Sequence, residues 1–210
     1  MISKIQYIGA ASAQHTQLEN IQAALIAGAN WIQLRLKNKT TDEVRRTALS
    51  VREMCRQHNA QFLLNDFVDI AKEVQADGVH LGQNDMSTTH ARQLLGENAI
   101  IGGTANTWEQ IVAYAAAEAV DYIGLGPFRF TKTKEKLSPV LGLKGYREIV
   151  QQCRVHDIQL PIIAIGGIQL TDIESIMTTG VHGIAVSGLI TYAENKAKIL
   201  TAIHQQMGDH

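Results

Sequence analysis

Four short polar clusters in this chain carry the side chains that could do chemistry, and each follows an apolar segment. Cations and amides bind phosphate oxygens, carboxylates hold a divalent metal ion, and hydroxyl groups complete an anion site. We therefore expect one site for a phosphorylated substrate and a metal ion if the fold brings the clusters together. The clusters are Gln33-Leu34-Arg35-Leu36-Lys37, Asn65-Asp66, Asp85 and Thr131-Lys132-Thr133-Lys134.

The first cluster alternates polar and apolar residues, and successive side chains of a strand face opposite sides. Gln33, Arg35 and Lys37 then share one face, while Leu34 and Leu36 share the other. In the crowded interior of a closed sheet, an amide and two cations on one face are better explained as ligand-binding groups than as surface charges. The alternative is a solvated edge strand whose last lysine points into water.

The second and third clusters offer carboxylates to a metal ion. Mg²⁺ prefers oxygen ligands, usually takes one or two carboxylates, and completes its shell with substrate phosphate and water. Asp66 and Asp85 match that demand, although either could instead cap the helix that follows it. His80 lies in an apolar segment, which favours a structural histidine over a catalytic base. The sequence has no HxH, HExxH or CxxC pairing, which argues against a zinc site.

The fourth cluster and two glycine-containing turns could hold a second anion. Hydroxyls and an ammonium between Thr131 and Lys134 suit an anion that a loop encloses, although a solvated lysine-rich tip would have the same composition. Gly166-Gly167 and Val186-Ser187-Gly188 follow the last two apolar segments. Glycines let backbone donors approach a phosphate closely, so we interpret these turns as a phosphate site rather than as two tight turns.

These clusters must be positioned by a repeating pattern of short apolar segments and longer stretches with helical spacing. The apolar segments are too hydrophobic for a sheet with one wet face, which favours a parallel sheet covered by helices. The predicted strands are Ile5–Gly9, Trp31–Leu36, Gln61–Leu64, Gly78–Leu81, Ala99–Gly102, Tyr122–Leu125, Pro161–Ile165 and Gly183–Val186.

The intervening stretches predict helices, three of which we expect to begin after Thr41, Thr107 and Thr171 as capping residues. A closed (β/α)8 barrel and an open doubly wound sheet both fit this order, and the count favours a single (β/α)8 TIM barrel domain over residues 1–210. The predicted helices are Leu18–Ala27, Asp42–His58, Val68–Glu73, Ser87–Leu95, Trp108–Ala117, Gly145–Cys153, Thr171–Met177 and Lys196–Met207.

Composition limits the class of function. The 210 residues include 19 Lys and Arg against 20 Asp and Glu, so no global field favours nucleic acid or an anionic membrane surface. Cys55 and Cys153 lack metal-like spacing, and no signal peptide or membrane-spanning apolar run is evident. We expect a soluble, cytoplasmic protein that acts on small molecules, with no nucleic acid or membrane partner. The sequence leaves open whether the chain forms a homo-oligomer.

The ordered set of motifs resembles the thiamine phosphate synthase family along nearly the whole chain. Members of that family are (β/α)8 enzymes that join a pyrimidine diphosphate to a thiazole phosphate. The motifs that carry the resemblance are Gln33-Leu34-Arg35-Leu36-Lys37, Asn65-Asp66, Asp77-Gly78-Val79-His80-Leu81-Gly82-Gln83-Asn84-Asp85, Thr131-Lys132-Thr133-Lys134, Gly166-Gly167-Ile168 and Val186-Ser187.

The resemblance implies a role for each cluster. Asp66 and Asp85 would bind Mg²⁺, and Arg35, Lys37 and Lys134 would stabilise the departing pyrophosphate as catalytic groups. Loss of pyrophosphate would give a pyrimidine-methyl cation that the thiazole nitrogen captures, without a protein nucleophile. The pyrimidine diphosphate would be bound by Gln33, Leu34, Arg35, Leu36, Lys37, Asn65, Thr104 and Lys134. The thiazole phosphate, or its carboxylated form, would be bound by Thr131, Lys132, Thr133, Gly167, Val186 and Ser187.

Two segments depart from the family pattern. Where relatives usually have Gly-x-Ser-x-His-Thr, this chain has Gly102-Gly103-Thr104-Ala105-Asn106-Thr107. Thr104 keeps a hydroxyl for the pyrimidine, whereas Asn106 can hydrogen-bond but cannot transfer a proton near neutral pH. The first strand also ends in Ala10-Ala11 and lacks the acidic ending common in relatives.

Two other functions remain open at the level of sequence. A thiazole tautomerase shares the barrel but transfers a proton, and Asp66, Asp85 and Lys134 argue against it. A non-catalytic sensor of thiazole phosphate would need the glycine turns but not the diphosphate half, because fold alone does not determine function. Metal-dependent binding of the pyrimidine diphosphate would distinguish the synthase from both.

Overall fold

Eight parallel strands close into a barrel in the computed structural model, which describes residues 2–130 and 139–208. Each strand pairs with the next in sequence, and the first pairs with the last, so the sheet has no free edge. The predicted (β/α)8 barrel is therefore confirmed, and the open sheet is wrong. The strands are β1 (Ile5–Gly9), β2 (Trp31–Leu34), β3 (Gln61–Asn65), β4 (Gly78–Leu81), β5 (Ile100–Ala105), β6 (Tyr122–Leu125), β7 (Ile162–Ile165) and β8 (Gly183–Val186).

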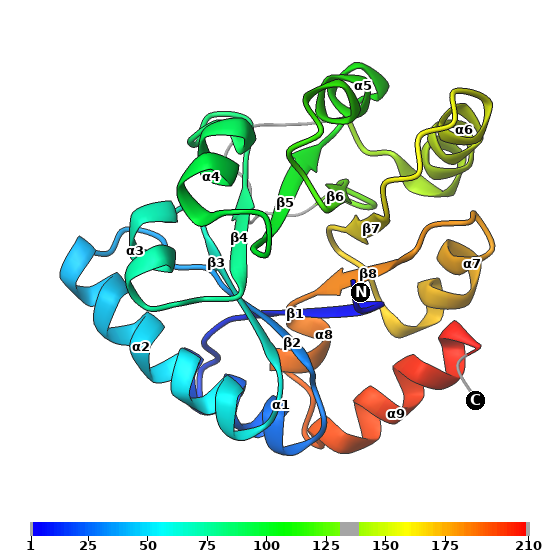
Figure 1. Ribbon diagram of the computed structural model, residues 1–210. Coiled ribbons are helices and arrows are strands. Elements are labelled where there is room, and N and C mark those ends of the chain that lie inside the picture. The colour runs from blue at the N-terminus through cyan, green and yellow to red at the C-terminus, as the bar shows by residue number, and fades with distance from the viewer. Residues whose placement is uncertain (1, 131–138, 209–210) are drawn as a thin grey trace.

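The helices surround the strands (Figure 1). Because a helix follows each strand, the loops after the strands all gather at one end of the barrel, where barrel enzymes place their sites. The helices are α1 (Gln17–Ile26), α2 (Thr41–Gln57), α3 (Val68–Glu73), α4 (Thr88–Leu95), α5 (Trp108–Ala117), α6 (Gly142–Val155), the 3-10 helix η1 (Leu170–Asp172), α7 (Ile173–Met177), α8 (Gly188–Thr191) and α9 (Lys196–Met207).

Several boundaries differ from the sequence-based prediction. Strand β2 ends at Leu34, so Arg35, Leu36 and Lys37 lie in the connection beyond the strand. Strand β5 continues to Ala105, and the short helix α8 was not predicted. Strand β2 pairs with β3 only from Trp31 to Leu34, which explains why the strand ends before the alternating sequence pattern does.

The helix caps were predicted with mixed success. Thr107 caps α5 by accepting a hydrogen bond from the Gln110 N–H, as expected. Thr171 was wrong, because it lies inside η1 and the Gln169 N–H is held by Asp172 instead. Thr41 was wrong by one residue, because Thr40 is the capping residue of α2.

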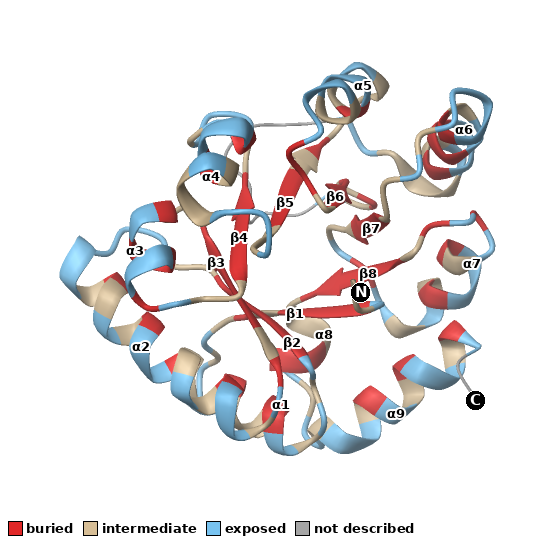
Figure 2. Ribbon diagram, in the orientation of Figure 1, coloured by how far each residue is buried: buried red, intermediate tan, exposed pale blue. Residues whose placement is uncertain are grey.

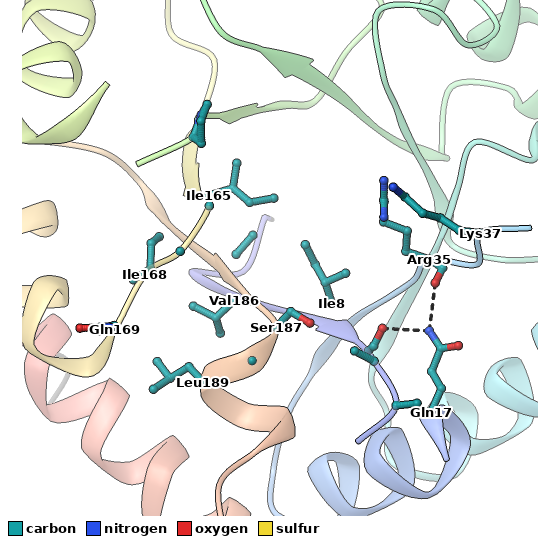
Figure 3. A pocket seen from close by; sticks show the side chains of 18 residues that line it. Ile8, Gln17, Arg35, Lys37, Ile165, Ile168, Gln169, Val186, Ser187 and Leu189 are labelled. Carbon is teal, nitrogen blue, oxygen red and sulfur yellow. Dashed lines mark hydrogen bonds between the residues drawn. The ribbon is translucent and has the colours of Figure 1, made fainter. Parts of the chain in front are cut away.

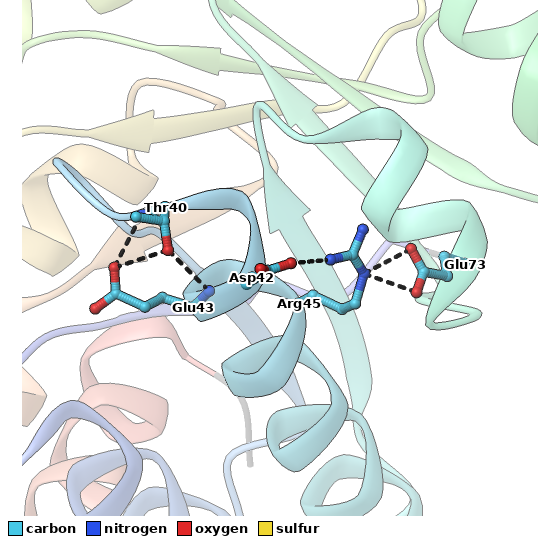
Figure 4. A network of polar contacts seen from close by, with 5 residues as sticks. All are labelled: Thr40, Asp42, Glu43, Arg45 and Glu73. Atoms are coloured by element: carbon cyan, nitrogen blue, oxygen red, sulfur yellow. Dashed lines mark hydrogen bonds and ion pairs between the residues drawn. The ribbon is translucent and has the colours of Figure 1, made fainter.

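An exposed polar network fixes the start of α2 (Figure 4). The side chains of Thr40 and Glu43 each accept a hydrogen bond from the other's backbone N–H, which satisfies two donors that the helix start leaves unpaired. Arg45 bonds Asp42 at 2.6 Å and reaches Glu73 of α3 at 2.8 Å. This network connects two neighbouring helices at the surface and has no part in the barrel interior.

Two apolar regions hold the barrel together, and Figure 2 shows the buried strands inside helices whose outer faces are exposed. One region lies between the strands and the helices and includes Leu34 and Phe62. The other fills the barrel and includes Trp31 and Tyr122, whose rings meet edge to face at 5.0 Å between centroids. The interior is packed rather than hollow, so a ligand must bind at the rim. No helix of the described segments is long and apolar enough to span a membrane.

Candidate active site

A cavity of about 610 Å³ opens at the rim where β1, β2, β7 and β8 end. Arg35 and Lys37 approach it from one side, and the turns after β7 and β8 form the other, with Gly167 and Ser187 among the lining residues (Figure 3). Ile8, from β1, lies between them. The barrel thus brings together two of the groups predicted from separate parts of the sequence.

Gln17 holds the cationic side of this cavity in place. Its amide nitrogen donates to the Gly9 carbonyl at 2.8 Å and to the Arg35 carbonyl at 3.0 Å (Figure 3). A residue at the start of α1 therefore joins the ends of β1 and β2 and fixes the backbone of Arg35. This role could not be predicted from the sequence, because a glutamine in the first turn of a helix is ordinary.

The alternation predicted for the first cluster is present. Gln33 points into the barrel, is 1% exposed, and donates to Gln6 Oε1 at 3.2 Å. Leu34 is fully buried on the opposite side, and Leu36 packs against the same apolar region. Arg35 and Lys37 are thus the members of the cluster that reach the cavity with their side chains, and the solvated edge strand is wrong.

Asp66 and Asp85 form a carboxylate pair after β3 and β4. Burial, a side-chain hydrogen bond with Asp85 and the charge of Asp85 raise the pKa of Asp66 to about 7, against the opposing charges of Arg35 and Lys37. One carboxylate of such a pair keeps its proton near neutral pH unless a cation replaces it. The pair is therefore chemically suited to a divalent metal ion.

Neither carboxylate serves as the helix cap that was the alternative. Asp66 lies in a left-handed turn with φ of 71°, and α3 begins without a side-chain cap. Ser87 caps α4, whereas Asp85 Oδ2 accepts from the Gly82 N–H at 2.6 Å and so is held toward its own loop. Over the described residues, no group of three or more His, Cys, Asp or Glu could hold a metal ion. Phosphate and water would have to complete the shell of an ion at the pair.

Asn65 lies at the end of β3, is 6% exposed, and pairs in register with His80 of β4. The next residue continues this connection, because the Asp66 N–H donates to the His80 carbonyl at 3.0 Å. The amide and the carboxylate are therefore held at the same rim. The charge of Asp66 also interacts with the cationic side of the cavity, since Arg35 and Lys37 both act to lower its pKa.

The glycine turn after β7 depends on backbone geometry that other residues rarely adopt. Gly166 and Gly167 have φ of 103° and 69°, and a Cβ at Gly166 would lie 2.8 Å from Pro127 Cα. Gly167, Val186 and Ser187 all line the cavity, as the resemblance implied. This side of the rim therefore offers mainly backbone groups to a ligand.

Arg129 and Asp172 support that turn, a role for which the sequence has no signal. Arg129 donates to the Gly167 carbonyl at 2.5 Å and to Asp172 at 2.9 Å. Burial raises the pKa of Asp172, but hydrogen bonds from Arg129 and the Gln169 N–H, with the charge of Arg129, leave it below its ordinary value. An arginine in the loop after β6 and an aspartate in η1 form no local pattern that could have predicted the pair.

The two residues that depart from the pattern of the resembling family, Thr104 within β5 and Asn106 directly after it, have distinct roles. Thr104 Oγ1 lies 2.9 Å from Nε2 of His80, whose Nδ1 lies 2.8 Å from the Tyr122 hydroxyl. His80 is thus satisfied within the barrel, as expected for a structural histidine. Asn106 donates to the Gly126 carbonyl and joins the end of β5 to the loop after β6. In this chain the asparagine is a structural connection rather than a proton carrier.

The fourth cluster lies outside the described residues. Its predicted roles in binding and in stabilising pyrophosphate stay predictions, and they fall on Thr131, Lys132, Thr133 and Lys134. The loop that carries them begins beside the glycine turn, because the Phe128 N–H donates to the Ile165 carbonyl at 2.8 Å.

The rim places cations between a carboxylate pair and a glycine turn, which is the arrangement of a barrel enzyme for phosphorylated substrates. A family model described as thiamine monophosphate synthase matches residues 6–190. The chain belongs to the thiamine monophosphate synthase family, and the resemblance drawn from the motifs is confirmed.

Individual relatives support the same family. The thiamine-phosphate synthase of Flavobacterium psychrophilum is 51% identical and covers 99% of this chain and 100% of its own length. That of Bacteroides thetaiotaomicron is 50% identical over 92% of each chain. Among solved structures, thiamine phosphate pyrophosphorylase from Pyrococcus furiosus superposes with a TM-score of 0.83 at 32% identity, covering 98% of this chain and 95% of its own. The chain is thus an enzyme of this family that acts on small molecules.

Proposed function

We propose that the chain joins a pyrimidine-methyl diphosphate to a thiazole phosphate, giving thiamine phosphate and pyrophosphate. The observation that carries this proposal is the position of Arg35 and Lys37. These cations line the cavity of the glycine turn and also act on Asp66 of the carboxylate pair. A diphosphate at the carboxylate pair and a second substrate in the cavity would therefore meet at the same two side chains.

The half of the rim after β2, β3 and β4 suits the diphosphate. Asp66 and Asp85 would hold Mg²⁺, which when bound supplies positive charge to the diphosphate oxygens. Arg35, Lys37 and Asn65 would bind the oxygens that remain, and Gln33 and Thr104 lie deeper, where the pyrimidine ring would enter. Leu34 and Leu36 would contribute through their backbone only, since their side chains face the core.

The half after β7 and β8 suits the thiazole phosphate. Gly167, Val186 and Ser187 line the cavity, and glycine lets backbone donors approach phosphate oxygens closely. The apolar wall of the same cavity, with Ile8, Ile165 and Leu189, suits the thiazole ring. Thr131, Lys132 and Thr133 would complete this site from outside the described residues.

The reaction needs no protein nucleophile. The bond between the methylene carbon and the diphosphate oxygen breaks, and its electron pair leaves with pyrophosphate. The lone pair of the thiazole nitrogen then forms a bond to the pyrimidine-methyl cation. Arg35 and Lys37, with Lys134, would stabilise the charge that grows on the leaving group, so their contribution is larger in the transition state than in the bound substrate. Holding the thiazole close limits capture of the cation by water.

A thiazole tautomerase and a thiazole phosphate sensor each explain fewer of the residues at the rim than a synthase does. A tautomerase needs a proton-transfer group, but Asn106 is tied to a backbone carbonyl and cannot act as one. A sensor of thiazole phosphate has no use for the carboxylate pair. We also propose that residues 1–210 act as one catalytic domain, because the motifs of both halves are distributed along the whole barrel.

The test is to measure pyrophosphate release and thiamine phosphate formation from the two substrates, with Mg²⁺ and with chelator. Metal-dependent formation of both products in equal amounts supports the synthase. Binding of thiazole phosphate without either product would contradict it and favour the tautomerase or the sensor.

A further inference from the structure

Five inward-facing side chains form a polar chain below the rim, four of them buried and each from a different strand. Gln6 donates to the Tyr122 hydroxyl at 3.0 Å, and Gln33 also hydrogen-bonds Tyr122. The Tyr122 hydroxyl lies 2.8 Å from His80 Nδ1, and His80 Nε2 lies 2.9 Å from Thr104 Oγ1. This polar chain runs from the packed interior to Thr104, the residue expected to contact the pyrimidine.

The barrel makes space for this chain with two glycines. A Cβ at Gly102 would overlap the Tyr122 ring, and one at Gly124 would lie 2.9 Å from His80 Cε1. Both glycines have ordinary backbone angles, so side-chain space rather than conformation requires them. Tyr122 and His80 are therefore fitted into positions that larger neighbours would not allow.

The hydrogen bonds have a direction that follows from the donors available. Tyr122 is fully buried, and burial raises the pKa of its hydroxyl, against hydrogen bonds from Gln6 and Gln33, so the phenol keeps its hydrogen. Because the amide nitrogen of Gln6 donates to the phenol oxygen, the phenol hydrogen is directed to His80 Nδ1. A neutral imidazole that accepts at Nδ1 carries its hydrogen on Nε2.

His80 Nε2 then donates to Thr104 Oγ1, which leaves the hydroxyl hydrogen of Thr104 for another acceptor. The backbone of Thr104 is fixed as well, because its carbonyl accepts from Gln83 at 2.5 Å and from Tyr114 at 3.2 Å. We propose that Tyr122 and His80 are positioning residues that turn the Thr104 hydroxyl into a donor for an acceptor nitrogen of the pyrimidine. The last clause of this proposal rests on the proposed function, whereas the direction of the buried hydrogen bonds does not.

The direction can be measured in the free protein by nitrogen NMR of histidine-labelled chain. The chain has eight histidines, and the His80 signals are identified by their loss in His80→Gln and by contact with the Thr104 methyl group. We expect a neutral ring with hydrogen on Nε2. Hydrogen on Nδ1, or a doubly protonated ring at neutral pH, would overturn the proposal without bearing on whether the chain is a synthase.

Tyr122→Phe removes the donor to His80 and keeps the ring. We expect the His80 ring to change to the form with hydrogen on Nδ1, or to a mixture of both forms. Tyr114→Phe is the matched control, because it removes a hydroxyl that bonds the Thr104 carbonyl instead of the chain of side chains. An unchanged His80 signal in Tyr122→Phe, or the same change in both variants, would contradict the proposal.

Kinetics then test whether the direction matters for substrate. Tyr122→Phe should raise KM for the pyrimidine diphosphate roughly 3- to 10-fold, the effect of about one hydrogen bond, and leave KM for the thiazole phosphate unchanged. In a Thr104→Val background the same change should have little further effect, because Tyr122 acts through Thr104. Thr104→Ser should retain the wild-type response, and fully independent effects of Tyr122→Phe and Thr104→Val would contradict the link.

Discussion

The two halves of the rim are built differently. After β3 and β4, the carboxylates of Asp66 and Asp85 hydrogen-bond to each other, and the cations Arg35 and Lys37, just beyond the end of β2, act on Asp66. After β7, the turn consists of glycines at positive φ, with Arg129 donating to a backbone carbonyl. One half therefore offers a ligand charged side chains, and the other offers mainly backbone groups.

This difference determines which properties a substitution in each half should change. Removing a charge from the first half changes electrostatics while leaving the shape in place, so catalysis should suffer more than folding. Adding a single methyl group to the second half changes the backbone itself, so binding and stability should change together.

Asp85→Asn should give the largest effect, a loss of turnover on the order of 10²- to 10³-fold, because a negative ligand is removed from the proposed metal site. The asparagine oxygen can still accept from the Gly82 N–H, so the loop and the fold should be preserved. Initial rates of pyrophosphate release across a range of Mg²⁺ concentrations measure the effect.

The matched control for Asp85→Asn is Glu97→Gln, an exposed change in the connection from α4 to β5. Mg²⁺ should also raise the melting temperature of the wild-type protein and of Glu97→Gln more than that of Asp85→Asn. Wild-type turnover and metal dependence in Asp85→Asn would remove this residue from the metal site.

Gly166→Ala should come second, weakening binding of the thiazole phosphate by roughly tenfold. A left-handed backbone costs a residue with a Cβ about 1 to 2 kcal/mol, and the new atom would press on Pro127. Calorimetric titration with thiazole phosphate, in the absence of the diphosphate substrate, measures the affinity.

Gly96→Ala is the control for backbone strain. Gly96 has φ of 83° and no atom within 4 Å of its added Cβ, so it should lose stability without losing affinity. If both alanine variants bind thiazole phosphate like the wild type, the glycine turn does not shape the phosphate site.

Asp172→Asn tests the support beneath the glycine turn and has an expected dependence on pH. The pKa of Asp172 is lowered in the folded protein. Its charge therefore stabilises the fold at pH values above its ordinary pKa of 3.8, and this contribution is lost as pH falls through the folded pKa. We expect the variant to be less stable by only on the order of 1 kcal/mol near neutral pH, because the partial exposure of Arg129 weakens the ion pair. Urea unfolding at several pH values measures the difference.

The difference in unfolding free energy between Asp172→Asn and the wild type should shrink as pH falls below about 4, where the wild-type carboxylate gains a proton and becomes neutral, as the asparagine already is. A difference that grows toward acid would contradict the lowered pKa. The variant should bind thiazole phosphate slightly more weakly, since Arg129 also donates to the Gly167 carbonyl.

Much of the fold and of the rim could be predicted from the sequence, because local patterns carry them. The segment Gly78–Leu81 was predicted with its observed bounds, and parallel strands necessarily bring the residues that follow them to one end. The contact between Asp66 and Asp85 follows from that rule, since β3 and β4 are neighbours.

What could not be predicted depends on contacts across the barrel. Gln6 meets Tyr122 at a separation of 116 residues, and Arg129, in the loop after β6, meets Asp172 of η1. Neither pair has a local signature, because closure of the sheet and its register decide which inward side chains touch. The end of β2 at Leu34 is set in the same way, by pairing with β3 and not by the alternating pattern beyond it.

Arg45→Ala should have the smallest effect and supplies the baseline for exposed charge. Arg45 bonds Asp42 and Glu73 at the surface of α2 and α3 (Figure 4), and exposed ion pairs contribute little to stability because water and salt screen them. We expect a small loss of stability, smaller still at high salt, and unchanged turnover. A fall in turnover comparable to that of Asp85→Asn would mean that loss of charge anywhere near the barrel impairs catalysis. The contrast between the two halves of the rim would then have no basis in where each charge lies.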